Sequence, residues 1–357
     1  MRKMDHIINN IQGLDQVSIK MAQTQLDSLT KPRGSLGRLE ELAKQLAGIT
    51  RQKRFSLKNK VIFTLAADHG IAEEGISAYP QEVTIQMVYN FLNDGAGINV
   101  LARMAGARVV IVDMGVAHHV DHPKTEMGSF KNKKIRSGTM NFIKEPAMTR
   151  DEAVRSLEAG MDVLEEELEK GVDIIGTGEM GIGNTTSASA ITACITGHNV
   201  KDVTGLGTGI DEKRLEYKKQ LIEKALTKHK PDPLDAIDVL SKVGGFEIGG
   251  MAGIMLAAAH HKIPVIIDGF ISGTAALIAS QLQPKVKEYM IAAHCSVEKG
   301  HTIILRHMGL KPLLDLDLRL GEGTGAALAM NIVEAGAKIF HEMATFENAG
   351  VSQKETL

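Results

Sequence analysis

Short, uninterrupted runs of apolar and β-branched residues constrain the fold of this chain more than any other feature of its sequence. Four of them are plain and a fifth is weaker, at residues 61–66, 109–113, 172–176, 264–268 and 289–293. The runs do not alternate apolar with polar residues, as strands with one solvated face do. Continuous apolar runs are typical of parallel strands covered on both faces. The sequence therefore predicts a parallel sheet buried inside the protein.

Segments with helical periodicity separate these runs. The clearest one follows Thr149 and Glu152, which form a capping-box signature, and carries apolar side chains on one face as far as Leu168. Strands that alternate with helices predict a doubly wound α/β fold with a mainly parallel, Rossmann-like sheet. In such folds ligands bind at the carboxyl ends of the strands.

The two ends of the chain differ from its middle. Residues 14–50 have a helical pattern that a loop at 31–35 interrupts, and the residues from about 297 onward are also helical in pattern. We therefore expect a large α/β domain over 51–296 that carries the nucleotide site. We expect a small, discontinuous helical domain built from 1–50 and 297–357.

Composition narrows the class of protein. The chain has 357 residues and a formal net charge of −2, which gives no electrostatic reason to expect nucleic acid or an anionic membrane as a partner. The basic stretch at 131–136 predicts a solvated loop rather than an anion site. Cys194 and Cys295 are far apart and form no metal or disulfide pattern, which favours a reducing compartment. No apolar run reaches the roughly 20 residues that span a bilayer, and the start lacks the apolar core of a signal peptide, so a cytoplasmic location is expected.

One acidic residue stands out in the glycine-rich run at 319–325. Glu322 lies between Gly321 and Gly323, and a helical pattern begins near Thr324. Glycine on both sides removes side-chain cover and permits a tight turn. A carboxylate offered at a helix start is a candidate general base. It could equally be an acid that interacts with the helix dipole.

A second glycine-rich segment, at 176–187, is entered by a predicted strand and left by a predicted helix. Free N–H groups at such a helix start favour phosphate, to which Asn184 could also donate. Gly176, Gly178 and Gly181 match the G-x-G-x-x-G spacing of dinucleotide sites, a weak signal alone. Glu179 inside the loop would repel a pyrophosphate and is better suited to ribose hydroxyls or a cationic ring. A tight strand–helix turn without a ligand is the alternative.

A third glycine cluster, at 204–209, precedes a predicted helix that Asp211 would cap. Lys218 on that helix could give a point charge to a phosphate held by the glycine loop. A flexible loop with a surface lysine is an equally open alternative.

Polar residues also follow the other predicted strands. Asp68 and His69 favour a structural contact with each other over a metal site, because no second His–acid pair stands at ligand spacing. Asp268 could bind ribose hydroxyls or could be the acid of a β-turn. Ser296 has no nucleophile elbow around it and predicts a hydrogen bond to phosphate or backbone.

Taken together, these motifs resemble the nicotinate-nucleotide:dimethylbenzimidazole phosphoribosyltransferases, which act in the lower-ligand branch of cobalamin synthesis. The likeness runs from near residue 20 to near residue 345, and the order and joint presence of the motifs make it specific. The matching stretches are 31–40, 67–70, 178–181, 184–186, 240–246, 268–270, 298–300 and 319–323.

The resemblance implies a reaction and its residues. Nicotinate mononucleotide would give its phosphoribosyl group to 5,6-dimethylbenzimidazole, yielding α-ribazole 5′-phosphate and nicotinate. Glu322 falls on the family's general base and Glu179 on its second active-site glutamate. The phosphate and ribose contacts would fall on Gly181, Gly183, Gly205, Gly207, Lys218, Asp268 and Ser296.

The resemblance also implies an acceptor pocket near Tyr79 and Met87 and a homodimer. We expect no cofactor or metal, because a phosphate held by loop amides needs none and no pyrophosphate leaves. Three alternatives remain at this point. The chain could use another acceptor base, could be an NAD(P)-dependent oxidoreductase, or could bind the nucleotide without catalysis.

Overall fold

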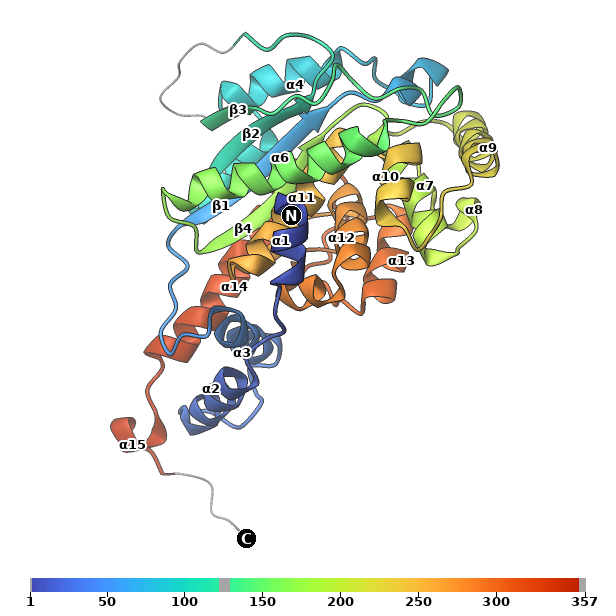
Figure 1. The fold of residues 1–357 in the computed structure, drawn as a ribbon. Helices are drawn as coiled ribbons and strands as arrows, with labels where there is room; N and C mark the ends of the chain where they lie inside the picture. Colours follow the sequence, from blue (N-terminus) through green and yellow to red (C-terminus); the bar gives the residue numbers. More distant parts are fainter. Residues whose placement is uncertain (1, 122–128, 353–357) are drawn as a thin grey trace.

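A computed structural model describes residues 2–121 and 129–352 of the chain. Within them a single parallel sheet has the strand order β3-β2-β1-β4-β5-β6 (Figure 1). The strands are β1 Lys60–Ala67, β2 Ala107–Gly115, β3 Ser129–Asn132, β4 Ile174–Met180, β5 Val265–Ile267 and β6 Met290–Ala292. The order reverses between β1 and β4, and such a switch point opens a crevice at the carboxyl ends of the strands. The doubly wound, Rossmann-like fold is confirmed.

Each of the five apolar runs forms a strand, and three details were not predicted. Strand β3 was missed because its four residues are mostly polar. The neighbouring basic side chains are not freely solvated, because Lys131 and Lys133 pair with Glu166 at 2.6 and 2.7 Å. Strand β4 runs on to Met180, past the predicted end at residue 176.

Helices connect the strands and cover both faces of the sheet (Figure 1). They are α1 Lys3–Asn9, α2 Gln16–Ser28, α3 Arg38–Thr50, α4 Val83–Leu92, α5 Gly97–Ala105, α6 Arg150–Leu168, α7 Asn184–Thr196, α8 Val200–Val203, α9 Glu212–His229, α10 Ala236–Val243, α11 Phe246–His260, α12 Phe270–Leu282, α13 Lys299–Met308, α14 Thr324–Glu342 and α15 Phe346–Ala349. Two 3₁₀ turns, η1 Gly70–Glu74 and η2 Pro284–Tyr289, join them. The predicted capping box at the start of α6 is present.

Alternate residues of β1 belong to two separate hydrophobic cores. Phe63 and Leu65 pack with α6, α11 and α12, whereas Ile62 and Ala66 pack with α4, α5 and α14. Helix α11 can lie close to α6 because glycines face backbone there. A Cβ built on Gly253 would stand 2.0 Å from the carbonyl oxygen of Leu157. These contacts hold the helices on the two faces of the sheet and so fix the position of the strand ends.

The helices of the two chain ends meet at one end of the molecule. Helices α2 and α3 pack against α14, and an isolated bridge joins Leu29 to Thr345. Helix α14 also covers β1, β4 and β5, and α1 packs on α6 and α11. The division of the chain into residues 51–296 and a discontinuous helical domain stays a prediction. No helix among the described residues is long and apolar enough to cross a membrane.

Candidate active site

The turn that carries Glu322 has a backbone found at few other places in the chain. Gly321, Glu322 and Gly323 have φ angles of 83°, 63° and 98°, all in the left-handed region. A residue with a side chain is strained in this conformation, and strained backbone conformations are found most often at functional sites. The turn leads directly into α14, so the side chain of Glu322 is presented at the start of that helix.

Several contacts hold this turn against the sheet. Thr64 on β1 donates its hydroxyl to the carbonyl oxygen of Glu322 at 2.9 Å, and the N–H of Ile98 donates to Oε2 of Glu322 at 3.0 Å. Gly178 on β4 lets the turn approach, since a Cβ there would stand 2.1 Å from that same carbonyl oxygen. Glu322 is 4% exposed. Burial raises the pKa of its carboxyl, and the nearby charge of Asp268 adds to the rise, against the N–H of Ile98.

Glu179 lies beside this turn, within β4 and not in a loop as predicted. A Cβ on Gly321 would stand 2.3 Å from Oε1 of Glu179, so the two glutamates belong to one site. Asn184 donates its side-chain amide to Oε2 of Glu179. Burial raises the pKa of Glu179 to about 8, with further contributions from Glu247, Asp268 and Glu322. Carboxylates that crowd together cannot all ionise easily.

The dinucleotide interpretation of the G-x-G-x-x-G spacing is wrong. Gly176 and Gly178 are residues of β4 on one face of the sheet, where α14 packs. A Cβ on Gly176 would stand 2.9 Å from that of Ala326. The loop begins only at Gly181, and Gly183 ends it as the N-cap of α7, with no side chain capping the helix.

The loop at Gly181 and Gly183 packs closely against the end of β1 and against α4. A Cβ on Gly181 would stand 2.5 Å from the carbonyl oxygen of Ala67 at the end of β1. The N–H of Ile182 donates to the hydroxyl of Thr84 on α4 at 3.1 Å. The uncapped start of α7 therefore lies at the carboxyl ends of β1 and β4, where an anion would be stabilised by the helix dipole.

Lys218 is not the surface lysine of the alternative interpretation, because it is 1% exposed. Its Nζ donates to the hydroxyl of Thr185 at 2.8 Å. Glu298 accepts the N–H of Gly207 at 2.9 Å and lies against Gly205. Burial lowers the pKa of Lys218 to about 8, and the charge of Glu298 opposes this. A buried ammonium beside a glycine loop and a helix start suits a phosphate.

Asp268 and Ser296 follow β5 and β6 and are both buried. Oδ2 of Asp268 accepts the N–H of Gly323 at 3.2 Å, and Oδ1 accepts that of Ala326 at 3.0 Å. The hydroxyl of Ser296 accepts the N–H of Glu298 at 3.3 Å, which is the backbone bond among its predicted alternatives. Burial raises the pKa of Asp268, against the charge of His294 and the N–H groups of α14.

Known proteins share this architecture and sequence. A family model described as phosphoribosyltransferase matches residues 11–351 of the chain. The chain belongs to this phosphoribosyltransferase family. It is 56% identical over 346 residues to the nicotinate-nucleotide–dimethylbenzimidazole phosphoribosyltransferase of Desulforudis audaxviator, and the match covers 97% of each chain. The corresponding protein of Dehalococcoides mccartyi is 50% identical over 356 residues, and the match covers both chains fully.

Solved structures agree with the family. A crystal structure of nicotinate-nucleotide–dimethylbenzimidazole phosphoribosyltransferase from Thermus thermophilus matches with a TM-score of 0.89 and 42% identity, over 96% of this chain and 100% of that one. A structure named CobT from the same organism matches with a TM-score of 0.90 and 43% identity, over 95% and 100%. The oxidoreductase alternative has no support from either comparison.

A second buried cluster in this phosphoribosyltransferase was not found by sequence reasoning. His69 does not hydrogen-bond to Asp68; its Nε2 lies 2.7 Å from Oε1 of Glu247 and its Nδ1 3.1 Å from the hydroxyl of Ser187. His69 and Glu247 are fully buried. The His69 ring lies beneath Gly181, so it supports the loop that carries Asn184. Residues 69, 187 and 247 are far apart in sequence, and no local pattern joins them.

The residues predicted near the acceptor occupy different environments. Met87 is half-buried on α4, the helix whose Thr84 hydroxyl accepts the N–H of Ile182 in the glycine loop. Tyr79 is 56% exposed in the segment before that helix. A role for Met87 and Tyr79 in the acceptor pocket stays a prediction.

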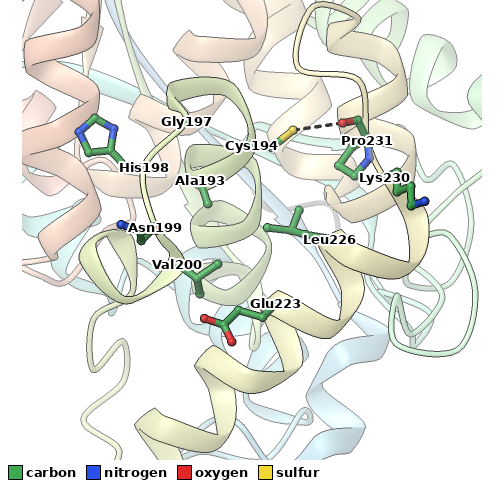
Figure 2. A pocket seen from close by; sticks show the side chains of 10 residues that line it. All are labelled: Ala193, Cys194, Gly197, His198, Asn199, Val200, Glu223, Leu226, Lys230 and Pro231. Atoms are coloured by element: carbon green, nitrogen blue, oxygen red, sulfur yellow. Dashed lines mark hydrogen bonds between the residues drawn. The ribbon is translucent and has the colours of Figure 1, made fainter.

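A cavity of about 350 Å³ lies away from these residues, between α7 and α9 (Figure 2). It opens at the C-terminal end of α7, whereas the glycine loop lies at the N-terminal end of that helix. Burial raises the pKa of Cys194, which lines it, to about 11, so the thiol stays protonated near neutral pH. No group of three or more His, Cys, Asp or Glu residues in the described part of the chain could hold a metal ion.

Proposed function

We propose that this phosphoribosyltransferase transfers the phosphoribosyl group of nicotinate mononucleotide to 5,6-dimethylbenzimidazole, with Glu322 as the general base. The products are α-ribazole 5′-phosphate and nicotinate. The observation that carries the proposal is the buried Glu322 carboxylate, with a raised pKa, on a constrained turn at the carboxyl ends of the strands. The names of the relatives support the choice of substrates.

In the reaction one glycosidic bond breaks, another forms, and one proton is transferred. The bond between C1′ and the pyridinium nitrogen breaks, and its electron pair stays on the departing ring, which becomes a neutral pyridine nitrogen. The lone-pair nitrogen of the benzimidazole forms the new bond to C1′ from the opposite face, so β becomes α. The ring N–H then acidifies, and Glu322 takes the proton. A raised pKa brings the base nearer to the operating pH, where general-base catalysis is efficient.

Glu179 has a different task in this proposal. Once ionised, its carboxylate stabilises the positive charge that develops on the ribose as the pyridinium leaves. Its pKa of about 8 means that much of it holds a proton near neutral pH. A cationic substrate favours the ionised form, because an opposite charge nearby lowers the pKa of a carboxyl.

The phosphate is assigned to Lys218, Thr185 and the backbone at Gly205 and Gly207, with the start of α7 beside them. The support is the burial of the ammonium and its bond to Thr185. Binding the phosphate there would fix C1′ relative to both rings, and such positioning supplies a large part of the rate.

We also propose that the chain acts as a homodimer in the cytoplasm. Exposed apolar pairs one helical turn apart support a protein partner, Val17 with Met21 on α2 and Val100 with Met104 on α5. Light scattering behind a sizing column measures the mass, and a monomer at micromolar concentration contradicts the dimer.

Glu322→Gln tests the base directly, because the amide keeps the shape and loses the ability to take a proton. We expect kcat to fall by ~10²–10⁴-fold, the usual contribution of general-base catalysis. Glu342→Gln, the same substitution at the exposed far end of α14, is the matched control. Chromatography of nicotinate and α-ribazole 5′-phosphate gives the rates. A kcat for Glu322→Gln within about threefold of the control would remove Glu322 from the mechanism.

The acceptor base is tested by competition. Equal concentrations of dimethylbenzimidazole, adenine and a phenol are offered with nicotinate mononucleotide, and the products are separated. Predominant α-ribazole 5′-phosphate supports the proposed acceptor. Predominance of another glycoside gives the same chemistry a different substrate, and binding without nicotinate release would leave only a nucleotide-binding protein.

A further inference from the structure

Helix α14 begins without a side-chain cap of its own. Its N-cap is Gly323, which has no side chain, and Glu322 precedes it. The first N–H groups of a helix have no partner within the helix and need acceptors from outside. Here a distant residue supplies them, since Asp268 at the end of β5 accepts the N–H groups of Gly323 and Ala326.

Both oxygens of Asp268 are therefore in use. The side chain is 2% exposed; Oδ2 accepts the N–H of Gly323 at 3.2 Å and Oδ1 that of Ala326 at 3.0 Å, and the N–H of Gly325 also favours the ionised carboxylate. A carboxylate at a helix start is favoured by the dipole as well as by these bonds. The sequence suggested that Asp268 contacts ribose or phosphate, whereas the two hydrogen bonds described here go to the backbone at the start of α14.

The surroundings of Asp268 are built to bring the carboxylate close to the helix. A Cβ on Gly325 would stand 2.8 Å from Oδ1 of Asp268 and 2.1 Å from Cδ2 of His294. Glycine at 325 therefore permits the approach of both side chains. Nε2 of His294 lies 3.8 Å from Oδ1 of Asp268, so the imidazole stands beside the carboxylate at the helix start.

The same helix start determines where Glu322 points. The N–H of Gly323 that Asp268 accepts belongs to the peptide that follows Glu322, in a turn with three successive positive φ angles. Such a backbone persists only where its surroundings over-determine it. Thr64 fixes the carbonyl of that same peptide from the opposite side of the peptide bond. Asp268 and Thr64 thus hold the N–H and the C=O of a single peptide unit.

We propose that Asp268 is a positioning residue that acts through Glu322, by anchoring the peptide between Glu322 and Gly323, and that it does not contact the sugar or the phosphate. The inference rests on the proposed role of Glu322 as the base. Asp268 would then have a structural role at the end of a strand, where residues of this fold usually contact ligands.

A double-mutant cycle separates this role from direct binding. Asp268→Asn keeps one acceptor oxygen and replaces the other by an NH₂ group, so it can no longer accept both the N–H of Gly323 and that of Ala326. We expect kcat to fall roughly 10- to 100-fold, because hydrogen bonds to charged groups are among the strong ones. The KM for nicotinate mononucleotide should stay within about threefold. Asp15→Asn, the same change at the cap of α2, controls for loss of a capping carboxylate elsewhere.

The decisive comparison is made in the Glu322→Gln background. If Asp268 acts only by placing the base, Asp268→Asn should lower kcat there by less than about threefold, because residues that act as a unit are not additive. A full, additive loss in that background overturns the inference, as does a rise of ten-fold or more in the KM for nicotinate mononucleotide. If Glu322→Gln alone has no effect, the proposed base fails instead.

A measurement on the wild-type protein covers the case in which Asp268→Asn does not fold. A crystal structure with bound α-ribazole 5′-phosphate should leave both Asp268 oxygens on the N–H groups of Gly323 and Ala326. A ribose hydroxyl or phosphate oxygen within hydrogen-bond distance of the Asp268 carboxylate would contradict the inference directly.

Discussion

The hydroxyl of Thr64 should matter for catalysis, although Thr64 is far from Glu322 in the sequence and is not assigned a contact with substrate. It is fully buried and donates to the carbonyl oxygen of Glu322 at 2.9 Å. Thr64→Val keeps the branched shape and removes the donor, so the change is not conservative. A buried acceptor left without its partner costs about 1–3 kcal/mol.

The unpaired carbonyl oxygen of Glu322 can find another donor only if the turn at residues 321–323 moves. The left-handed conformation at Glu322 stores strain, on the order of 1–3 kcal/mol, that its contacts must offset. If the lost bond acted wholly on the barrier, kcat would fall about 5- to 150-fold, at tenfold for each 1.36 kcal/mol. We expect about 5- to 30-fold, because part of the cost is released as the turn relaxes.

The assay measures kcat and both KM values together with the denaturant midpoint. Thr64→Ser is the matched control, because it keeps the hydroxyl and loses one methyl, which costs about 1 kcal/mol of stability. Its kcat should stay within about threefold of wild type, since the donor remains. If Thr64→Val loses stability yet keeps kcat within twofold, the peptide contact does not place the base, and the reasoning from strain is wrong.

Two further predictions concern the pH profile of kcat/KM for nicotinate mononucleotide, which reports groups of the free enzyme. Glu179 has a pKa raised to about 8, so kcat/KM should rise as pH increases toward 8 and the carboxylate ionises; Glu179→Gln should remove this rise toward pH 8. Lys218 has a pKa lowered to about 8, so kcat/KM should fall above pH 8 as the ammonium loses its proton. Lys218→Met should flatten that alkaline limb and raise KM by about 10- to 100-fold, and an unchanged limb would exclude Lys218 as the phosphate ligand.

Much of the fold could be predicted because the strands carry their own signal. Continuous apolar runs identified β1, β2, β4, β5 and β6, and caps placed the start of α6. Strand β3 escaped because three of its four residues are polar, and one of them, Lys131, pairs with Glu166. A strand that is defined by its neighbours leaves little trace in its own sequence.

The candidate site was predicted unevenly for a physical reason. Glu322 stands out because an acidic residue between two glycines is unusual, whereas Lys218 was only a candidate on the helix that follows a glycine cluster; the structure buries both. The unit of His69, Ser187 and Glu247 could not be found, because its members lie after β1, in α7 and in α11, which meet only in the folded chain. Spacing along the sequence cannot report contacts between strands and helices.

The glycines around Glu322 suggested a bare turn that offers its carboxylate freely, and the structure gives them another purpose. Gly321 makes room for Glu179, Gly323 for Ile62, and Gly178 for the carbonyl of Glu322 itself. Each missing Cβ is replaced by a neighbouring group, so the turn is crowded and not bare. Crowding removes water from the carboxylate and so raises its pKa, whereas a solvated turn would leave it a weak base. Glycine thus acts here by letting other parts of the chain approach the base.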